Sequence, residues 1–253
     1  MSTRSWELRA YQAIAAILVL VLLWVLFRGH ISGDLVIFFA CAIPSVILHE
    51  IAHGWVALAF GDDTAKRAGR LTLNPLSHID PFGTILLPVM MLLVGLPVLA
   101  YAKPVPVNVS RLRRPRNQWP IVALAGPATN GLLMGIATLL LRYPAHSWLI
   151  AYANDLGGGV GPSSGARVAQ VLVYLGEANI LLGLFNLLPI PPLDGSAVLE
   201  RLLPRRAWPA YLKFRRYSMI LFIVIFVVVL SRSNLYDDIL NPVFNWWQKV
   251  ILS

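Results

Sequence analysis

The sequence predicts an all-α, polytopic membrane protein, and three observations lead to that class. Of the 253 residues, 57% are hydrophobic and 13% are charged, a composition that would leave a water-soluble domain with large exposed apolar patches. Six apolar runs reach the length of about 20 residues that a membrane-crossing helix needs. The basic residues gather in short loops beside these runs. The net charge of +9 therefore fits contact with anionic headgroups, and we expect no nucleic-acid partner.

The apolar runs set the expected order of helices. The first is longer than a signal-peptide core, and no small-x-small cleavage site follows it, so we expect it to be retained. No segment has the patterned polar sequence of a separate soluble domain. We therefore predict one membrane-embedded domain over residues 1–253, with a core at about 35–203 and accessory helices at both ends. The six runs are 10–28, 35–60, 82–101, 119–141, 168–188 and 212–231.

Two short membrane-associated β-strands are also expected. Apolar and polar residues alternate from Arg70 to Leu73, and Asn74-Pro75 ends this stretch. The second stretch, "AKPVPVNVS" at 102–110, contains prolines that forbid a helix and fit an edge strand. Open strand edges are not tolerated in lipid, so both strands must lie at the interface or against protein.

The segment 82–101 determines whether the chain crosses the membrane five or six times. Its Pro88, Gly95 and Pro97 suit a re-entrant hairpin. If the segment dips in and returns, one side of the membrane receives 16 of the 21 Lys and Arg residues, whereas six crossings give 9 and 12. The positive-inside rule favours the hairpin, with the N-terminus in the cytoplasm.

The motif "HEIAH" gives the second run its chemistry. His49 and His53 are four residues apart, so on a helix they share one face and can hold one metal ion. Glu50 lies beside the first histidine, where it can act as a general base. The alternative is a pair of packing histidines with a glutamate paired to a cation. Ionisable groups are costly in a lipid-crossing helix and functional by default, which favours the metal.

A hydrolytic zinc ion normally takes three protein ligands, and Asp194 is the candidate for the third. It follows the prolines of "LLPIPPLDG", where an apolar helix must stop. Alternatively, Asp194 only caps the next helix. His53 lies in the exit half of the second run, and Asp194 lies just beyond the run at 168–188. These ends meet if the two helices run in the same direction, which the hairpin arrangement provides.

Five motifs in order along residues 40–200 carry a family resemblance. "HEIAHGW", "GRLTLNPLSHIDPFGTILLP", "AKPVPVN", "GPATN" and "NLLPIPPLDG" resemble the site-2 protease family of intramembrane zinc metalloproteases, in its compact prokaryotic form without PDZ or CBS domains. The resemblance implies one zinc ion. It also implies roles for individual residues: His49, His53 and Asp194 as zinc ligands, Glu50 as general base, Asn186 at substrate or oxyanion, and Gly126 and Asn130 on a packing or substrate-contacting helix.

Several of these residues also have structural explanations. His78 and Asp80 can add to the metal site, or they can shape the turn after Asn74-Pro75. Asn130 can bond across helices, and Gly126 can permit a close helix contact.

The expected function is hydrolysis of a peptide bond within a transmembrane segment of another protein, at the cytoplasmic side of a bacterial cell membrane. The expected partners are that substrate and the lipid bilayer. A metal transporter and an inactive scaffold of the same fold are the alternatives.

Overall fold

The computed structural model describes residues 33–80, 83, 102–155, 164–231 and 233–253. The chain forms two compact units, Met1–Val36 with Ile79–Lys103 and Ile37–His78 with Pro104–Ser253. The candidate site and its supporting contacts lie in the second unit, so the description below concerns that unit.

The described residues are mainly helical, and no β-strand is assigned among them. Three helices are long and apolar enough to cross a membrane, at Val36–Ala59, Pro115–Arg142 and Ser164–Leu187. This identifies a multi-pass membrane protein. The helices are α2 (Gly33–Ala59), α3 (Thr64–Arg67), α5 (Pro115–Arg142), α6 (His146–Asp155), α7 (Ser164–Leu187), α8 (Gly195–Leu202), α9 (Trp208–Ser231) and α10 (Ser233–Leu252), with 3-10 turns η1 (Pro75–His78), η3 (Val109–Arg111) and η4 (Arg205–Ala207).

The helix positions confirm three of the predicted runs, because α2, α5 and α7 cover 35–60, 119–141 and 168–188 to within a few residues. The predicted run at 212–231 lies inside α9. The predicted first helix at 10–28 and the predicted hairpin at 82–101 lie outside the described residues.

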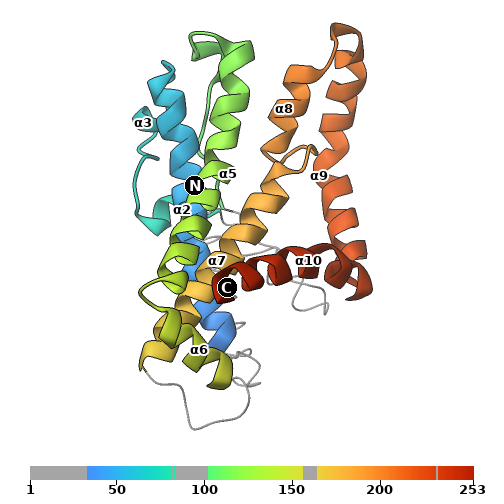
Figure 1. Ribbon diagram of the computed structural model, residues 1–253. Helices are drawn as coiled ribbons and strands as arrows, with labels where there is room; N and C mark the ends of the chain where they lie inside the picture. The colour runs from blue at the N-terminus through green and yellow to red at the C-terminus, as the bar shows by residue number, and fades with distance from the viewer. Residues whose placement is uncertain (1–32, 81–82, 84–101, 156–163, 232) are drawn as a thin grey trace, which may run out of the picture. The chain divides into compact units, whose positions relative to one another are not determined.

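Helix α5 is the central element, and its ends follow from local chemistry. Pro115 occupies the first turn, where its missing N–H costs nothing. Arg142 lies in the last turn, where its positive charge interacts favourably with the negative end of the helix dipole. Helices α7, α8 and α10 all pack against α5, and α6 packs on α7; the green α5 and the yellow-to-orange α7 lie side by side in Figure 1.

The two predicted strands are not present. Residues 71–72 form a bend, followed by η1, and 102–108 has no regular assignment. A strand is held by backbone N–H groups that donate to a neighbouring strand, and Pro104 and Pro106 have no backbone N–H. Two of the other amides bond side chains instead: Val105 N–H donates to Glu50 Oε2 at 2.8 Å, and Asn108 N–H donates to Asp62 Oδ2 at 2.6 Å.

The end of α2 lies beside the start of α5. The N–H of Arg113 donates to the carbonyl of Phe60 at 3.0 Å. Ala57, Leu112 and Val122 form a buried apolar cluster next to this bond. The chain therefore returns to the same end of α2 before α5 begins. The predicted hairpin arrangement requires the residues before and after 82–101 to lie at the same end of α2, and the described residues meet this requirement.

Candidate metal centre

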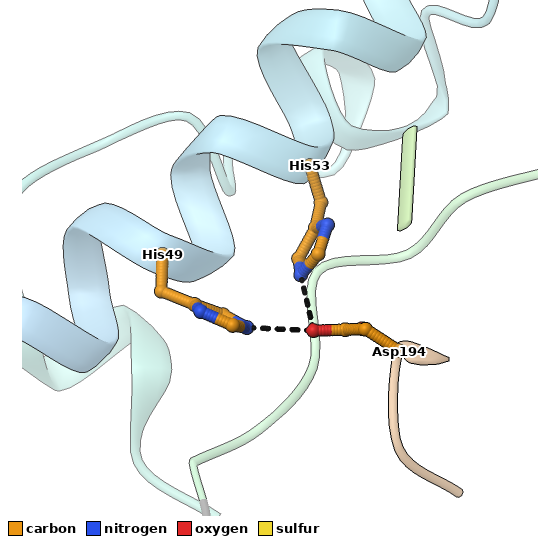
Figure 2. Close-up of side chains that lie close together, drawn as sticks. All are labelled: His49, His53 and Asp194. Atoms are coloured by element: carbon orange, nitrogen blue, oxygen red, sulfur yellow. Dashed lines mark ion pairs between the residues drawn. The ribbon is translucent and has the colours of Figure 1, made fainter. Parts of the chain in front are cut away.

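His49 and His53 project from the same face of α2, one turn apart. They are 5% and 8% exposed, although both are polar side chains. Their rings meet edge to face with centroids 4.7 Å apart. Figure 2 shows both rings directed toward Asp194, which comes from a different part of the chain.

Asp194 brings a carboxylate between the two histidines. Its Oδ2 lies 3.0 Å from Nε2 of His49 and 3.4 Å from Nε2 of His53, and one ligand atom from each residue lies within 4.8 Å of the others. Asp194 occupies the N-cap position of α8, but its side chain makes no capping hydrogen bond. Of the two sequence interpretations, the geometry therefore supports the metal ligand.

The turn before α8 is tight enough to need a glycine. A Cβ at Gly195 would lie 2.2 Å from the carbonyl oxygen of Leu187, the last residue of α7. This distance is far below a normal contact. The absence of a side chain at Gly195 therefore lets the chain fold back over the end of α7 and place Asp194 beside α2.

Protein hydrogen bonds orient both imidazoles through their Nδ1 atoms. His53 Nδ1 lies 2.7 Å from the carbonyl oxygen of Val122, and His49 Nδ1 lies 2.6 Å from Oδ1 of Asn130. A carbonyl oxygen only accepts, so each Nδ1 carries the proton. Each Nε2 is then left with a lone pair that faces Asp194, which is the usual arrangement of metal-binding histidines.

The donor set fits a divalent cation. The Asp194 carboxylate places Oδ2 between the two imidazoles. Oδ2 of this carboxylate is buried and has no hydrogen-bond partner among the described residues. Two imidazole nitrogens and one carboxylate oxygen thus converge on one position. Two imidazoles and a carboxylate, with a fourth position for water, are a typical catalytic zinc set.

Gly126 provides the space beside the two rings. A Cβ at this position of α5 would lie 2.5 Å from Cε1 and Nε2 of His49 and 2.5 Å from Nε2 of His53. The sequence predicts that Gly126 permits a close helix contact, and the family resemblance places it on a packing or substrate-contacting helix. The contact is with the ligand atoms themselves.

Glu50 lies beside the metal ligands and is held by the extended segment 104–108. Its Oε2 accepts the hydrogen bond from Val105 N–H. One turn further along α2, a Cβ at Gly54 would lie 2.5 Å from Leu71 Cδ2 and 3.0 Å from Val105 Cγ1. Gly54 therefore allows this segment to pass close to α2 at the level of Glu50.

The other predicted residues have local contacts. Asn130 is fully buried and contacts His49, which supports a positioning role; its contact with substrate stays a prediction. Asn186 Nδ2 donates to the carbonyl of Leu182, and its predicted contact with substrate is likewise untested. His78 Nε2 lies 2.9 Å from the carbonyl of Thr72. Asp80 accepts from Gly83 N–H at 2.7 Å. These last two contacts support the turn-shaping interpretation.

Sequence reasoning missed Ser45 and Asn179, two buried polar residues near the site. A signal for Ser45 was available, because Ser45, His49 and His53 recur every four residues and share one face of α2. Asn179 is a polar residue in an apolar helix, where such residues mark function or interhelical bonding.

Helices that cross a membrane and bring the two histidines of a His-Glu-x-x-His motif together with an aspartate as third candidate ligand define an intramembrane metallopeptidase. Comparison with known protein families agrees with this class, because the sequence profile of peptidase family M50 matches residues 37–230. The chain belongs to this family of zinc metallopeptidases.

Curated relatives carry related names. A protein named "Putative zinc metalloprotease YwhC" from Bacillus subtilis is 40% identical over 198 residues, covering 77% of this chain and 81% of that protein. A protein named "Putative zinc metalloprotease Rip2" from Mycolicibacterium smegmatis is 30% identical, covering 77% of this chain and 68% of its own length. Rip2 from Mycobacterium tuberculosis is 31% identical, covering 78% and 68%. No solved structure matches the chain.

Proposed function

We propose that this zinc metallopeptidase holds its ion with His49, His53 and Asp194 and cleaves transmembrane segments of substrate proteins with Glu50 as general base. The observation that carries the proposal is the convergence of three ligand atoms within 4.8 Å, from α2 and from the turn before α8. The family fixes the metal as zinc and the reaction as peptide-bond hydrolysis. The individual residue roles are the proposal.

The chain's own residues supply the rest of the chemistry. Zinc held by His49, His53 and Asp194 would polarise the scissile carbonyl and lower the pKa of water. Glu50, which follows His49 in the chain, would accept a proton from the attacking water and pass it to the leaving amine. The N–H of Val105 holds Oε2 of Glu50 and fixes the position of the carboxylate for this transfer.

The substrate has to lose helical structure before cleavage, because a helix hides its carbonyl oxygens in its own hydrogen bonds. Capture of the opened segment by β-strand addition has little support. In the segment 102–108, the amide of Val105 is bonded to Glu50, and two further positions are prolines. We keep Asn186, near the end of α7, as the predicted substrate contact.

The proposed orientation places the site toward the cytoplasm of a bacterial cell. The end of α2 that carries His53 lies beside the start of α5, through the bond between Arg113 and Phe60. This end is rich in positive charge, which the positive-inside rule assigns to the cytoplasm. The same return of the chain supports five crossings and a hairpin, within the single membrane domain expected over residues 1–253.

The direct test uses Glu50→Gln in purified protein with a transmembrane substrate. The amide cannot accept the proton, so we expect cleavage to fall by about 100-fold or more, while bound zinc stays at the wild-type level. Metal content is measured on the same preparations. Unchanged cleavage in Glu50→Gln would show that Glu50 is not the base.

The ligand set is tested separately by metal analysis. We expect His49→Ala and Asp194→Ala to lose stoichiometric zinc. Asp63→Ala is the matched control, because this exposed carboxylate pairs with Arg67 and Arg111 away from the site. Retention of wild-type zinc by Asp194→Ala would remove Asp194 from the ligand set.

A further inference from the structure

Four polar side chains form one continuous hydrogen-bonded chain through the space between α2, α5 and α7. His49 Nδ1 lies 2.6 Å from Asn130 Oδ1, and Asn130 Nδ2 donates to Asn179 Oδ1 at 2.8 Å. Asn179 Nδ2 donates to Ser45 Oγ at 2.9 Å, and Ser45 Oγ donates to the carbonyl of Cys41 at 2.8 Å. Ser45, Asn130 and Asn179 are each at most 1% exposed, so water does not compete for these bonds.

The polarity of this chain is fixed at its α7 end. Asn179 Nδ2 also donates to the carbonyl of Leu175, one turn earlier on α7, at 2.8 Å. A backbone carbonyl can only accept, so the nitrogen of the Asn179 amide must face Leu175 and its oxygen must face Asn130. Asn130 then has to present its own nitrogen to Asn179, and its oxygen is left for His49.

This polarity decides which nitrogen of His49 carries the proton. With an amide oxygen at 2.6 Å, Nδ1 is the protonated atom and Nε2 has a free lone pair. If the Asn130 amide turned over, its NH₂ would face Nδ1, and the proton would move to Nε2 and block the metal ligand. Asn130 alone does not prevent this, because both ends of an amide can form a hydrogen bond. A turned amide would set its oxygen against the oxygen of Asn179, which excludes the turn.

We propose that Asn179 is a positioning residue for the metal centre: through Asn130 it holds His49 in the tautomer that binds zinc. His53 needs no such support, because its Nδ1 meets the backbone carbonyl of Val122 directly. Both imidazoles are thus set by a backbone carbonyl, one directly and the other through two amides. The inference rests on the proposed role of His49 as a zinc ligand.

The test measures zinc affinity by chelator competition in purified protein, without reference to proteolysis. Asn179→Leu removes the oxygen that orients Asn130, and we expect zinc to bind about 10- to 100-fold more weakly. Thr138→Val is the matched control, because it removes another buried hydrogen bond, from Trp247 Nε1 to Thr138 Oγ1. This bond is not part of the hydrogen-bonded chain from His49 to Ser45, so the substitution should leave zinc binding unchanged. Should Asn179→Leu fail to fold, Asn179→Ser, too short to reach Asn130, takes its place with the same expected loss.

A double variant separates orientation from packing. The Asn130→Asp substitution would present an acceptor oxygen to His49 in either orientation of the side chain, so the tautomer of His49 would no longer depend on residue 179. We therefore expect Asn179→Leu to cause no further loss of zinc affinity in the Asn130→Asp background. An equal loss in both backgrounds, or wild-type affinity in Asn179→Leu alone, overturns the inference. Wild-type affinity in His49→Ala overturns the ligand assignment itself, and the two failures are thus distinguishable.

Discussion

Gly126 lies where α5 passes close to the candidate metal centre. A single added carbon would lie 2.5 Å from ring atoms of both histidines, and ring atoms held by hydrogen bonds cannot yield without moving Nε2. Real Cβ atoms do not approach other atoms this closely. The ligand geometry therefore depends on the absence of a side chain on the helix opposite the ligands.

We expect Gly126→Ala to weaken zinc binding by about 10- to 100-fold, since it displaces the imidazoles. Gly131→Ala and Gly135→Ala on the same helix are matched controls, because a Cβ at either position meets nothing within 4 Å. In the controls, alanine should raise the stability of α5 by about 0.5–1 kcal/mol. The measurement is zinc affinity beside thermal unfolding. Equal zinc affinity in all three variants would refute the steric argument.

The hydrogen bond from Val105 to Glu50 predicts an effect on turnover. Val105→Pro removes the donor N–H and also replaces the buried valine side chain, in a segment that already has proline on both sides. We expect kcat to fall by about 10- to 100-fold, because the general base loses its fixed position, while KM and bound zinc change little. Val105→Ala keeps the N–H and is the control. If Val105→Pro and Val105→Ala have the same kcat, the bond has no role in positioning Glu50.

At the scale of single residues, the sequence predicted those parts of the site that follow from helix period. His49, Glu50 and His53 lie on a continuous helix, so their relative positions are fixed by 3.6 residues per turn. The placement of Asp194 required an argument about helix direction. The contact between Asn179 and Asn130 depends on how α7 is rotated against α5, and one sequence does not contain that rotation.

At the scale of elements, α10 shows how a terminal helix is attached to the core. Trp247 is 1% exposed, and a Cβ at Gly176 of α7 would lie 2.2 Å from its ring. Its Nε1 donates to Thr138 of α5 at 2.8 Å. One tryptophan therefore joins α10 to both α5 and α7.

We expect Trp247→Ala to lower the free energy of unfolding by about 3–5 kcal/mol, from lost burial and the remaining cavity. The neighbouring Trp246 is 57% exposed, so Trp246→Ala should change stability by less than about 0.5 kcal/mol. Unfolding of both variants in the same detergent measures the difference. Equal destabilisation by the two substitutions would contradict the proposed attachment.

The elements also show where sequence reasoning fails. Three crossing helices were predicted to within a few residues, because long apolar runs are a strong signal. The two strands were wrong, because a strand depends on a partner that alternation does not reveal. In the segment 102–108, the amides of Val105 and Asn108 bond the side chains of Glu50 and Asp62 instead.

At the scale of the whole molecule, the proposed topology puts the start of α5 and its far end on opposite sides of the membrane. Lys66 and Arg201 lie at the proposed cytoplasmic side, and Tyr143 follows the far end of α5. All three are exposed, whereas Cys41, the single native cysteine, is buried. A single cysteine introduced at each position can thus be labelled selectively.

We expect a membrane-impermeant thiol reagent added to intact spheroplasts to label Tyr143→Cys. The Lys66→Cys and Arg201→Cys variants should react only after the membrane is opened, because their positive charges belong on the cytoplasmic face. Labelling of Lys66→Cys and Arg201→Cys from opposite sides would exclude a common face for the two ends that form the metal centre.

The hydrogen bond between His53 and the Val122 carbonyl has a consequence for how the enzyme responds to changes in zinc concentration. The bond belongs to the folded backbone, so the imidazole keeps its direction whether or not an ion is present. We therefore expect a chelator to remove the ion without unfolding the protein, and added zinc to restore it. Activity would then follow zinc availability reversibly, with no new synthesis of the chain.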